Sequence, residues 1–168
     1  MAILDELQPL AATQGDTDER EMEMLGPEHQ FAVVELSGQS LAIETLLCSS
    51  IRDVPQITPV PFTSNIVLGV ANIRGDIYSV VDVRSLLDLT PAPPDHTDPL
   101  IIVIIGSNYS CGMTIEGISE IIRIREGQIV EPLTEIPYVS GIYRRGQDNI
   151  LIVDVELLLA SPEMTEFQ

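Results

Sequence analysis

One segment of the chain occurs twice, and this repeat limits the folds that are open to it. The stretch VLGVANIRGDIYSVVDVRSLLD, which begins at residue 67, recurs in altered form 72 residues later as VSGIYRRGQDNILIVDVELLLA. Gly69 and Asp82 thereby correspond to Gly141 and Asp154. A unit of this length that is present only twice does not make a solenoid. We therefore expect two related lobes that pack side by side.

Short apolar runs rich in valine and isoleucine indicate a mainly β fold. Hydrophobic residues make up 45% of the chain, and 11 glycines and 12 prolines separate the runs. This pattern is typical of strands joined by tight turns. The predicted strands are residues 31–36, 40–46, 76–81, 100–105, 111–116 and 148–153, with 51–54 and 121–124 as strands or strand extensions. Leucines at helical spacing follow Asp82 and Asp154, which predicts a short helix after each aspartate.

The first thirty residues differ in composition from the rest. They contain eight acidic residues and one arginine, without a sustained hydrophobic period. Such a segment cannot bury enough apolar surface to fold alone. We expect residues 1–30 to form an acidic flexible arm, with at most one weak helical turn near residues 19–25. The arm is either a solvated leader, which we favour, or a tail that docks on a basic partner.

The remaining chain divides at a proline-rich stretch. The sequence PAPPDHTDP at residues 91–99 excludes regular secondary structure. We expect it to be the hinge between two lobes. The expected parts are a body at residues 31–160, lobes at about 31–90 and 100–160, and a C-terminal tail at 161–168.

The charge of the chain excludes several classes of partner. It has 26 acidic residues against eight arginines and no lysine, a formal charge of −18. This charge repels nucleic acid and anionic lipid headgroups. The longest apolar run, residues 100–105, is too short to span a membrane, and the acidic start is unlike a secretory signal. We expect a cytoplasmic protein with no direct membrane insertion.

Metal, cofactor and nucleophile motifs are missing from the sequence. Cys48 and Cys111 lie 63 residues apart without a CxxC pair, and His29 and His96 stand alone in polar segments. These spacings do not fit zinc, and the two thiols are expected to be buried and reduced. No phosphate loop, calcium loop or Gly-x-Ser-x-Gly motif is present. The sequence favours a protein without a cofactor or an enzymatic activity.

The two repeated aspartates allow two interpretations. Asp82 and Asp154 could cap the predicted helices by accepting hydrogen bonds from free N–H groups. They could instead form a carboxylate pair in a small acidic enzyme or metal-binding domain, which requires them to converge in one cleft. Capping is favoured because each aspartate precedes a leucine run. Glu44 and Glu116, which also match across the repeat, are expected to face water.

The segment Asn72-Ile73-Arg74-Gly75 is expected to form a turn between two strands. Gly75 allows a positive φ angle, and Asn72 can shape the loop. Arg74 then projects from the backbone. It is either a solvated turn residue or a contact for another protein, and interface cores prefer arginine to lysine. We favour the partner contact.

The same stretch resembles a known family. The sequence ITPVPFTSNIVLGVANIRGDIYSVVDVRSLLDL is similar to the signature of the CheW family, adaptors of bacterial chemosensory arrays. The resemblance continues through MTIEGISEIIRI and YVSGIYRRGQDNILIVDVELLL, and covers about residues 31–160. It implies two SH3-like five-stranded β-barrel lobes around a shared hydrophobic core. It also implies a protein without enzymatic activity.

The resemblance further implies a function and two partners. CheW-like adaptors bridge the cytoplasmic tip of a chemoreceptor and the regulatory domain of a CheA-type histidine kinase. The pathway is chemotaxis or a related one, such as pilus motility or phototaxis. The partner contacts implied are the turn residues Asn72 to Gly75, with Arg74 facing the receptor, and the pair Ile51 and Arg52. A decoy adaptor that dampens kinase coupling has the same sequence features.

Overall fold

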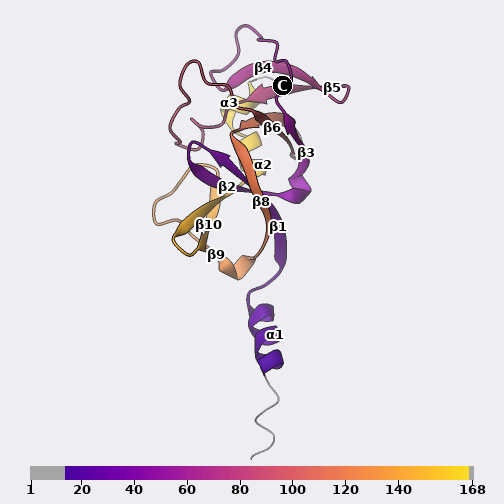
Figure 1. Cartoon of the computed structure of the whole chain (residues 1–168). Coiled ribbons are helices and arrows are strands. Elements are labelled where there is room, and N and C mark those ends of the chain that lie inside the picture. The colour runs from indigo at the N-terminus through magenta and orange to yellow at the C-terminus, as the bar shows by residue number, and fades with distance from the viewer. Residues whose placement is uncertain (1–13, 167–168) are drawn as a thin grey trace, which may run out of the picture.

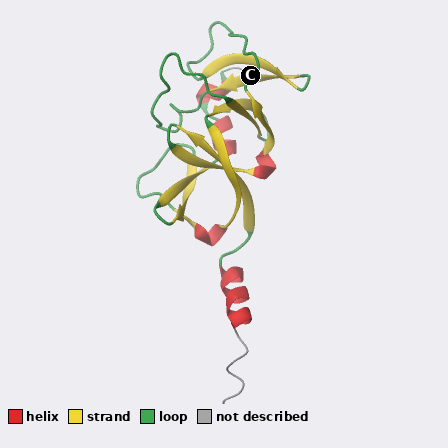
Figure 2. Ribbon diagram, viewed as in Figure 1, coloured by secondary structure: helices red, strands yellow, loops and turns green. Residues whose placement is uncertain are grey.

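Two β-sheets dominate the computed structural model, which describes residues 14–166 (Figures 1 and 2). One sheet has five strands in the order β3-β6-β7-β5-β4, and the other has six in the order β8-β1-β2-β11-β10-β9. The five strands are β3 (Cys48–Asp53), β4 (Val67–Ile73), β5 (Asp76–Val81), β6 (Leu100–Ile105) and β7 (Ser110–Ile115). The six are β1 (Glu28–Leu36), β2 (Gln39–Glu44), β8 (Gly117–Arg125), β9 (Ile129–Val130), β10 (Val139–Arg145) and β11 (Asp148–Val153). We call the two halves the five-strand lobe and the six-strand lobe.

Each predicted strand is present, although the one predicted at 40–46 ends at residue 44. One lobe has six strands rather than five, and the predicted lobe boundaries are wrong. Each lobe joins hairpins from both repeats, because β2 pairs in parallel with β11 and β5 pairs in parallel with β7. The chain crosses between the lobes at the 3₁₀ helix η2 (Thr45–Leu47) and again at Glu116. The proline-rich stretch 91–99 joins β5 to β6 within one sheet and is therefore not a hinge between lobes. A repeat in sequence thus marks the hairpins rather than the lobes.

One hydrophobic core serves both lobes, as the resemblance implied. Val34 and Leu41 of the six-strand lobe and Val81, Ile102 and Met113 of the five-strand lobe belong to a single buried cluster. Each of these five side chains is fully buried. Burying side chains of this size stabilises a fold by about 1.5–3 kcal/mol each. The shared core therefore fixes the two lobes as one unit.

A close backbone contact closes the five-strand lobe. Beyond β3 the chain returns to β4, where Thr58 and Val70 exchange backbone hydrogen bonds of 2.8 and 2.9 Å. Gly69 makes this approach possible, because a Cβ atom there would lie 2.2 Å from the Thr58 carbonyl oxygen. Its φ of +145° also disfavours other residues. The return segment therefore lies beside β4 and forms one wall of the surface described below.

Both ends of the described chain have more regular structure than the sequence predicted. Helix α1 (Gln14–Met24) is longer than the single turn expected, and β1 begins at Glu28 rather than at residue 31. Residues 1–13 of the expected arm lie outside the described residues. At the other end, α2 (Val155–Leu159) and α3 (Pro162–Thr165) follow β11, and Met164 is fully buried. The expected tail is therefore partly a packed element.

Helix α1 extends away from the body in Figure 1. Its methionines are exposed, by 51% at Met22 and 86% at Met24. No helix within the described residues is long and apolar enough to cross a membrane.

Truncation at two points tests this boundary. A chain that begins at Leu25 is expected to keep its melting temperature within a few degrees, because the side chains of residues 17–24 in α1 are exposed. A chain that begins at Phe31 is expected to be clearly less stable, because it loses three pairs of the β1–β8 ladder, from Glu28 to Gln30. Thermal unfolding followed by circular dichroism compares the two. Equal melting temperatures would show that the body begins at residue 31 after all.

Candidate partner-docking surface

The Arg74 turn is a tight two-residue hairpin loop. Ile73 pairs with Asp76, so Arg74 and Gly75 alone connect β4 to β5. Both have positive φ angles, 54° and 93°, as in the primed turns that suit two-residue hairpins. The Gly75 N–H donates to Asn72 Oδ1 at 3.0 Å. The predicted roles of Gly75 and Asn72 in shaping the turn are confirmed, whereas their contact with a partner stays a prediction.

The Arg74 side chain makes no polar contact within the described part of the chain. It is exposed, and within residues 14–166 its guanidinium makes no hydrogen bond or ion pair. A guanidinium presents five donors in a fixed planar fork that matches a carboxylate. In a chain of net charge −18, an unpaired arginine on a rigid turn is a local positive point. It is suited to contact an acidic group of another molecule.

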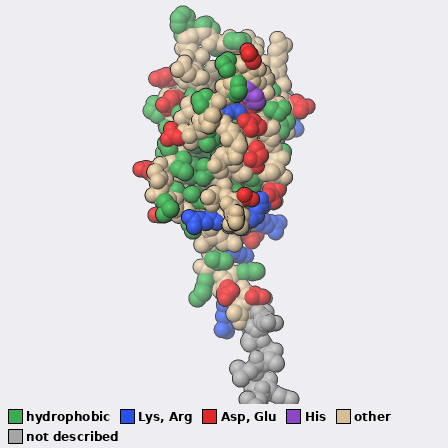
Figure 3. Space-filling model, turned by 60° about the vertical axis from the view of Figure 1, so that its left-hand side comes forward, with side chains coloured by type: hydrophobic (Ala, Val, Ile, Leu, Met, Phe, Trp, Pro, Cys, Tyr) green, Lys and Arg blue, Asp and Glu red, His purple; other side chains and the backbone are tan. Residues whose placement is uncertain are grey.

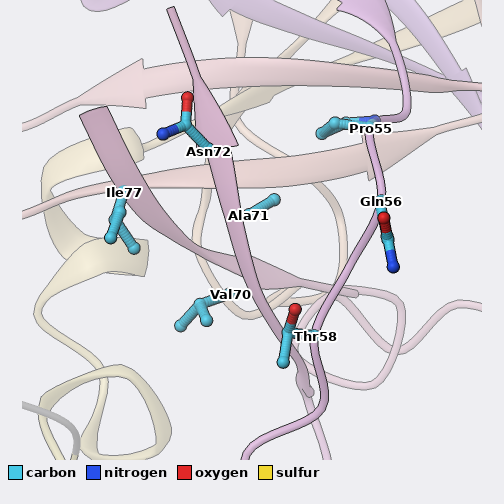
Figure 4. A pocket seen from close by; sticks show the side chains of 7 residues that line it. All are labelled: Pro55, Gln56, Thr58, Val70, Ala71, Asn72 and Ile77. Atoms are coloured by element: carbon cyan, nitrogen blue, oxygen red, sulfur yellow. The ribbon is translucent and has the colours of Figure 1, made fainter. Parts of the chain in front are cut away.

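An open hollow of about 400 Å³ lies along the same hairpin. Figure 4 shows the return segment after β3 running alongside β4, with side chains from both and from β5 around the space. Ile77, which lines it, is 74% exposed. The lining residues are Pro55, Gln56, Thr58, Val70, Ala71, Asn72 and Ile77. Apolar surface beside an arginine is the composition of a protein interface core.

The structure separates the predicted contact residues. Ile73 is 3% exposed and packs in the core of the five-strand lobe, so its prediction as a partner contact is wrong. Side chains alternate along β4, which turns Asn72 outward and Ile73 inward. Ile51 and Arg52 lie on β3, at the other end of the strand order from β4. Both are half-buried, and Ile51 packs against the shared core.

A buried arginine, Arg84, joins the two lobes. Arg84, 2% exposed, uses its guanidinium in five hydrogen bonds, which matches its five N–H donors. Asp98 accepts two of them, at 2.8 and 2.7 Å, and Asp82 accepts one at 2.8 Å. Glu116, at the crossing between lobes, accepts at 3.0 Å, and Ser37 Oγ of the β1–β2 turn accepts at 2.9 Å.

The charges of this Arg84 cluster are mutually stabilised. The hydrogen bond to Asp98 raises the pKa of Arg84 further above its ordinary value. Burial alone would raise the pKa of Asp98, but hydrogen bonds from Arg84 and His96 hold it below its ordinary value. The pKa of Glu116 is lowered by the hydrogen bond from the Ser37 N–H and by Arg84. Glu116 is therefore hydrogen-bonded between the lobes rather than simply facing water. Glu44 does not simply face water either, because its carboxylate contacts His29.

Three side chains of this cluster are close enough to hold a metal ion, but the Arg84 guanidinium already contacts two of them. The ligand atoms of His96, Asp98 and Glu116 lie within 4.8 Å of one another. Arg84 Nη2 lies between two of these groups, 2.7 Å from Asp98 Oδ1 and 3.0 Å from Glu116 Oε1. The arrangement neutralises carboxylates with a guanidinium and does not offer them to a metal ion.

The two repeated aspartates do different work. Asp154 caps α2, because its Oδ1 accepts from the Leu157 N–H at 2.9 Å. Asp82 is followed by a turn rather than a helix, so its prediction as a helix cap is wrong. It accepts from the Arg84 N–H at 3.0 Å and also binds the Arg84 guanidinium. The two carboxylates line different hollows and do not form a catalytic pair.

Alanine at Asp154 is expected to lower the free energy of unfolding by about 1 kcal/mol, the usual effect of a lost helix cap. Urea unfolding of the Asp154→Ala variant measures this. Asp154→Asn is the matched control, because asparagine also caps helices and should retain most of the stability. An alanine variant as stable as the asparagine variant would show that the cap contributes nothing.

Sequence reasoning did not identify Arg84 as a central residue. A local signal existed, since Arg84 stands within an apolar run two residues after an aspartate, and a charged residue that is buried requires partners. Its other partners, Asp98 and Glu116, could not be predicted from the sequence, because they lie 14 and 32 residues further along the chain.

Comparisons with known proteins agree with this architecture. The family model described as the CheW-like domain matches residues 30–163. A chemotaxis protein CheW from Helicobacter pylori is 30% identical over 153 residues, covering 88% of this chain and 89% of that protein. A chemotaxis protein CheW from Klebsiella aerogenes is 28% identical over 141 residues, covering 80% and 84%.

The fold is also similar to a solved structure. The scaffolding protein TtCheW from Thermoanaerobacter tengcongensis superposes with a TM-score of 0.70 at 22% identity, covering 82% of this chain and 96% of that one. The family match, the duplicated hairpins and the shared core agree with one another. The chain therefore belongs to the CheW-like domain family and is a non-catalytic scaffold of chemotaxis signalling.

Proposed function

We propose that this chain couples the cytoplasmic tip of a chemoreceptor to the regulatory domain of a CheA-type histidine kinase, and that Arg74 contacts the receptor. One observation carries the assignment of Arg74: an unpaired guanidinium on a rigid two-residue turn beside an open, partly apolar hollow. The family supplies the two classes of partner. These partners imply that the protein works in the cytoplasm.

Two features support a bridging role over simple binding. The shared core and the Arg84 cluster hold the two lobes in one arrangement, so surfaces on different lobes keep a fixed distance and angle. A rigid scaffold binds without a large loss of conformational entropy. Asn72, Arg74 and Ile77 lie on the five-strand lobe, which leaves the surface of the six-strand lobe available to a second partner.

Calorimetric titration tests the proposal. The chain is titrated separately with a receptor cytoplasmic fragment and with a kinase regulatory domain from the same genome. We expect both to bind, and we expect the chain saturated with kinase domain to bind the receptor fragment with unchanged affinity. A decoy adaptor would bind the kinase domain but not the receptor fragment. Absence of binding to either partner would contradict the proposal.

A further inference from the structure

His29 bridges two acidic residues that belong to different elements. Its Nδ1 lies 2.9 Å from Glu44 Oε1 at the end of β2, and its Nε2 lies 3.1 Å from Glu126 Oε1 in the 3₁₀ helix η3 (Glu126–Gln128). Its side chain is 34% exposed. The three side chains stand at the rim of a hollow of about 300 Å³ in the six-strand lobe. Phe31, Leu47 and Ile129 are among the apolar residues that line it.

Both contacts can be hydrogen bonds only when the ring is protonated. A neutral imidazole has one N–H donor and one acceptor, whereas an imidazolium has two donors. A carboxylate can only accept. In the neutral ring, one nitrogen lone pair would therefore face a carboxylate. The hydrogen bonds to Glu44 and then to Glu126 raise the pKa of His29 above its ordinary value of 6.5.

Helix η3 also holds the root of the N-terminal arm. The Gly127 N–H donates to the Leu25 carbonyl at 2.7 Å, and the Glu126 N–H donates to the Pro27 carbonyl at 3.1 Å. Arg125 Nη1 donates to the Gly26 carbonyl at 3.1 Å. A change in the position of η3 therefore changes the hydrogen bonds that hold residues 25–27, where α1 joins the body.

We propose that His29 is a proton-operated clasp between β2 and η3. Protonated, it ties Glu44 to Glu126 across the rim of the hollow and steadies the root of the arm. Neutral, it keeps one of these bonds and leaves the two carboxylates to repel each other. The clasp thus makes the rim of the hollow and the attachment of α1 respond to pH near neutrality.

The surrounding charges leave His29 as the titrating group of this rim. Glu28, beside it on β1, pairs with Arg125 at 3.5 Å and with Arg123 at 4.0 Å. Asp154 and Glu156 also line the hollow. Carboxylates and arginines keep their charge between about pH 6 and 9. Figure 3 shows arginine side chains at the end of the body next to the arm.

Nuclear magnetic resonance of the full chain tests the clasp. The chain has two histidines, so the His29→Gln and His96→Gln variants assign both ring signals. His96 is a matched control, because it also bonds a carboxylate, Asp98 at 2.8 Å, and its side chain is also 34% exposed. We expect His29 to titrate above pH 6.5, and the Glu126→Gln and Glu44→Gln variants each to lower its midpoint.

Amide hydrogen exchange then measures the mechanical effect. After correction for intrinsic exchange, protection of the Glu126 and Gly127 amides should fall about two- to fivefold as pH rises through the His29 midpoint, the effect of a partly exposed ion pair. The step should persist in His96→Gln and be absent in His29→Gln. The clasp is refuted by a His29 midpoint at or below 6.5. It is also refuted by a step that is missing in the wild type or that survives in His29→Gln or in Glu126→Gln.

Discussion

Replacing Arg84 with alanine is expected to lower the free energy of unfolding by about 3–5 kcal/mol, the usual effect of breaking a buried ion pair from one side. The substitution removes five hydrogen bonds and leaves Asp98, which is 7% exposed, without its counter-charge. Asp82 and Glu116 lose the same partner. Urea unfolding at neutral pH measures the change. If the variant is only partly folded at room temperature, the same titration is done at a lower temperature.

Arg123→Ala is the matched control for this experiment. The Arg123 side chain is 71% exposed and its ion pair with Glu28 spans 4.0 Å. An exposed pair of this kind contributes about 0–1 kcal/mol. If Arg84→Ala were no more destabilising than Arg123→Ala, the Arg84 cluster would not hold the lobes together.

The same cluster predicts loss of stability in acid. The pKa values of Asp98 and Glu116 are lower in the folded chain than their ordinary values. Groups of this kind stabilise the fold above their ordinary pKa, near 4, and this contribution disappears as pH falls through their folded pKa. We expect the free energy of unfolding of the wild type to fall below about pH 4. The fall should be smaller in Arg84→Ala, which has already lost the stabilised charges.

Arg74→Ala is expected to weaken binding of a receptor cytoplasmic fragment by about thirtyfold, which corresponds to about 2 kcal/mol, the loss typical of an interface anchor. Arg74→Glu should weaken it further, because it reverses the only charge at the turn that can meet an acidic partner. Stability should change by about 0.5 kcal/mol or less, since the side chain has no partner within the described part of the chain. Calorimetry and an unfolding curve on the same preparation measure both quantities.

Arg144→Glu provides the matched control for charge reversal. Arg144 is also exposed and lies in the equivalent hairpin of the six-strand lobe, paired with Asn149. It changes the net charge of the chain by the same amount as Arg74→Glu. If both variants weakened receptor binding equally, the effect would be one of overall charge. If neither did, Arg74 would be a turn residue only.

Features formed by residues close together in the chain could be predicted from the sequence, and features formed by distant residues could not. The Arg74 turn and the Asp154 cap were predictable because the residues involved are adjacent in the chain. The assignment of hairpins to lobes was not, because it depends on the parallel pairings of β2 with β11 and of β5 with β7. Repeats in sequence show which segments are alike, but not which of them pair.

Buried polar contacts were equally hidden. The Asp82 position matches Asp154 in the repeat, yet Asp82 meets a buried arginine and Asp154 caps a helix. The bridge between His29 and Glu126 joins residues 97 positions apart. Such contacts arise only once both sheets are assembled around the shared core.

Formation of a ternary complex tests the central claim most directly. Receptor cytoplasmic fragment is immobilised, and retention of the kinase regulatory domain is measured as the chain is added in increasing amounts. The account predicts that the wild-type chain retains the kinase domain, whereas Arg74→Glu retains little at the same concentrations. Failure of the wild-type chain to retain the kinase domain, or equal retention by Arg74→Glu, would contradict the account.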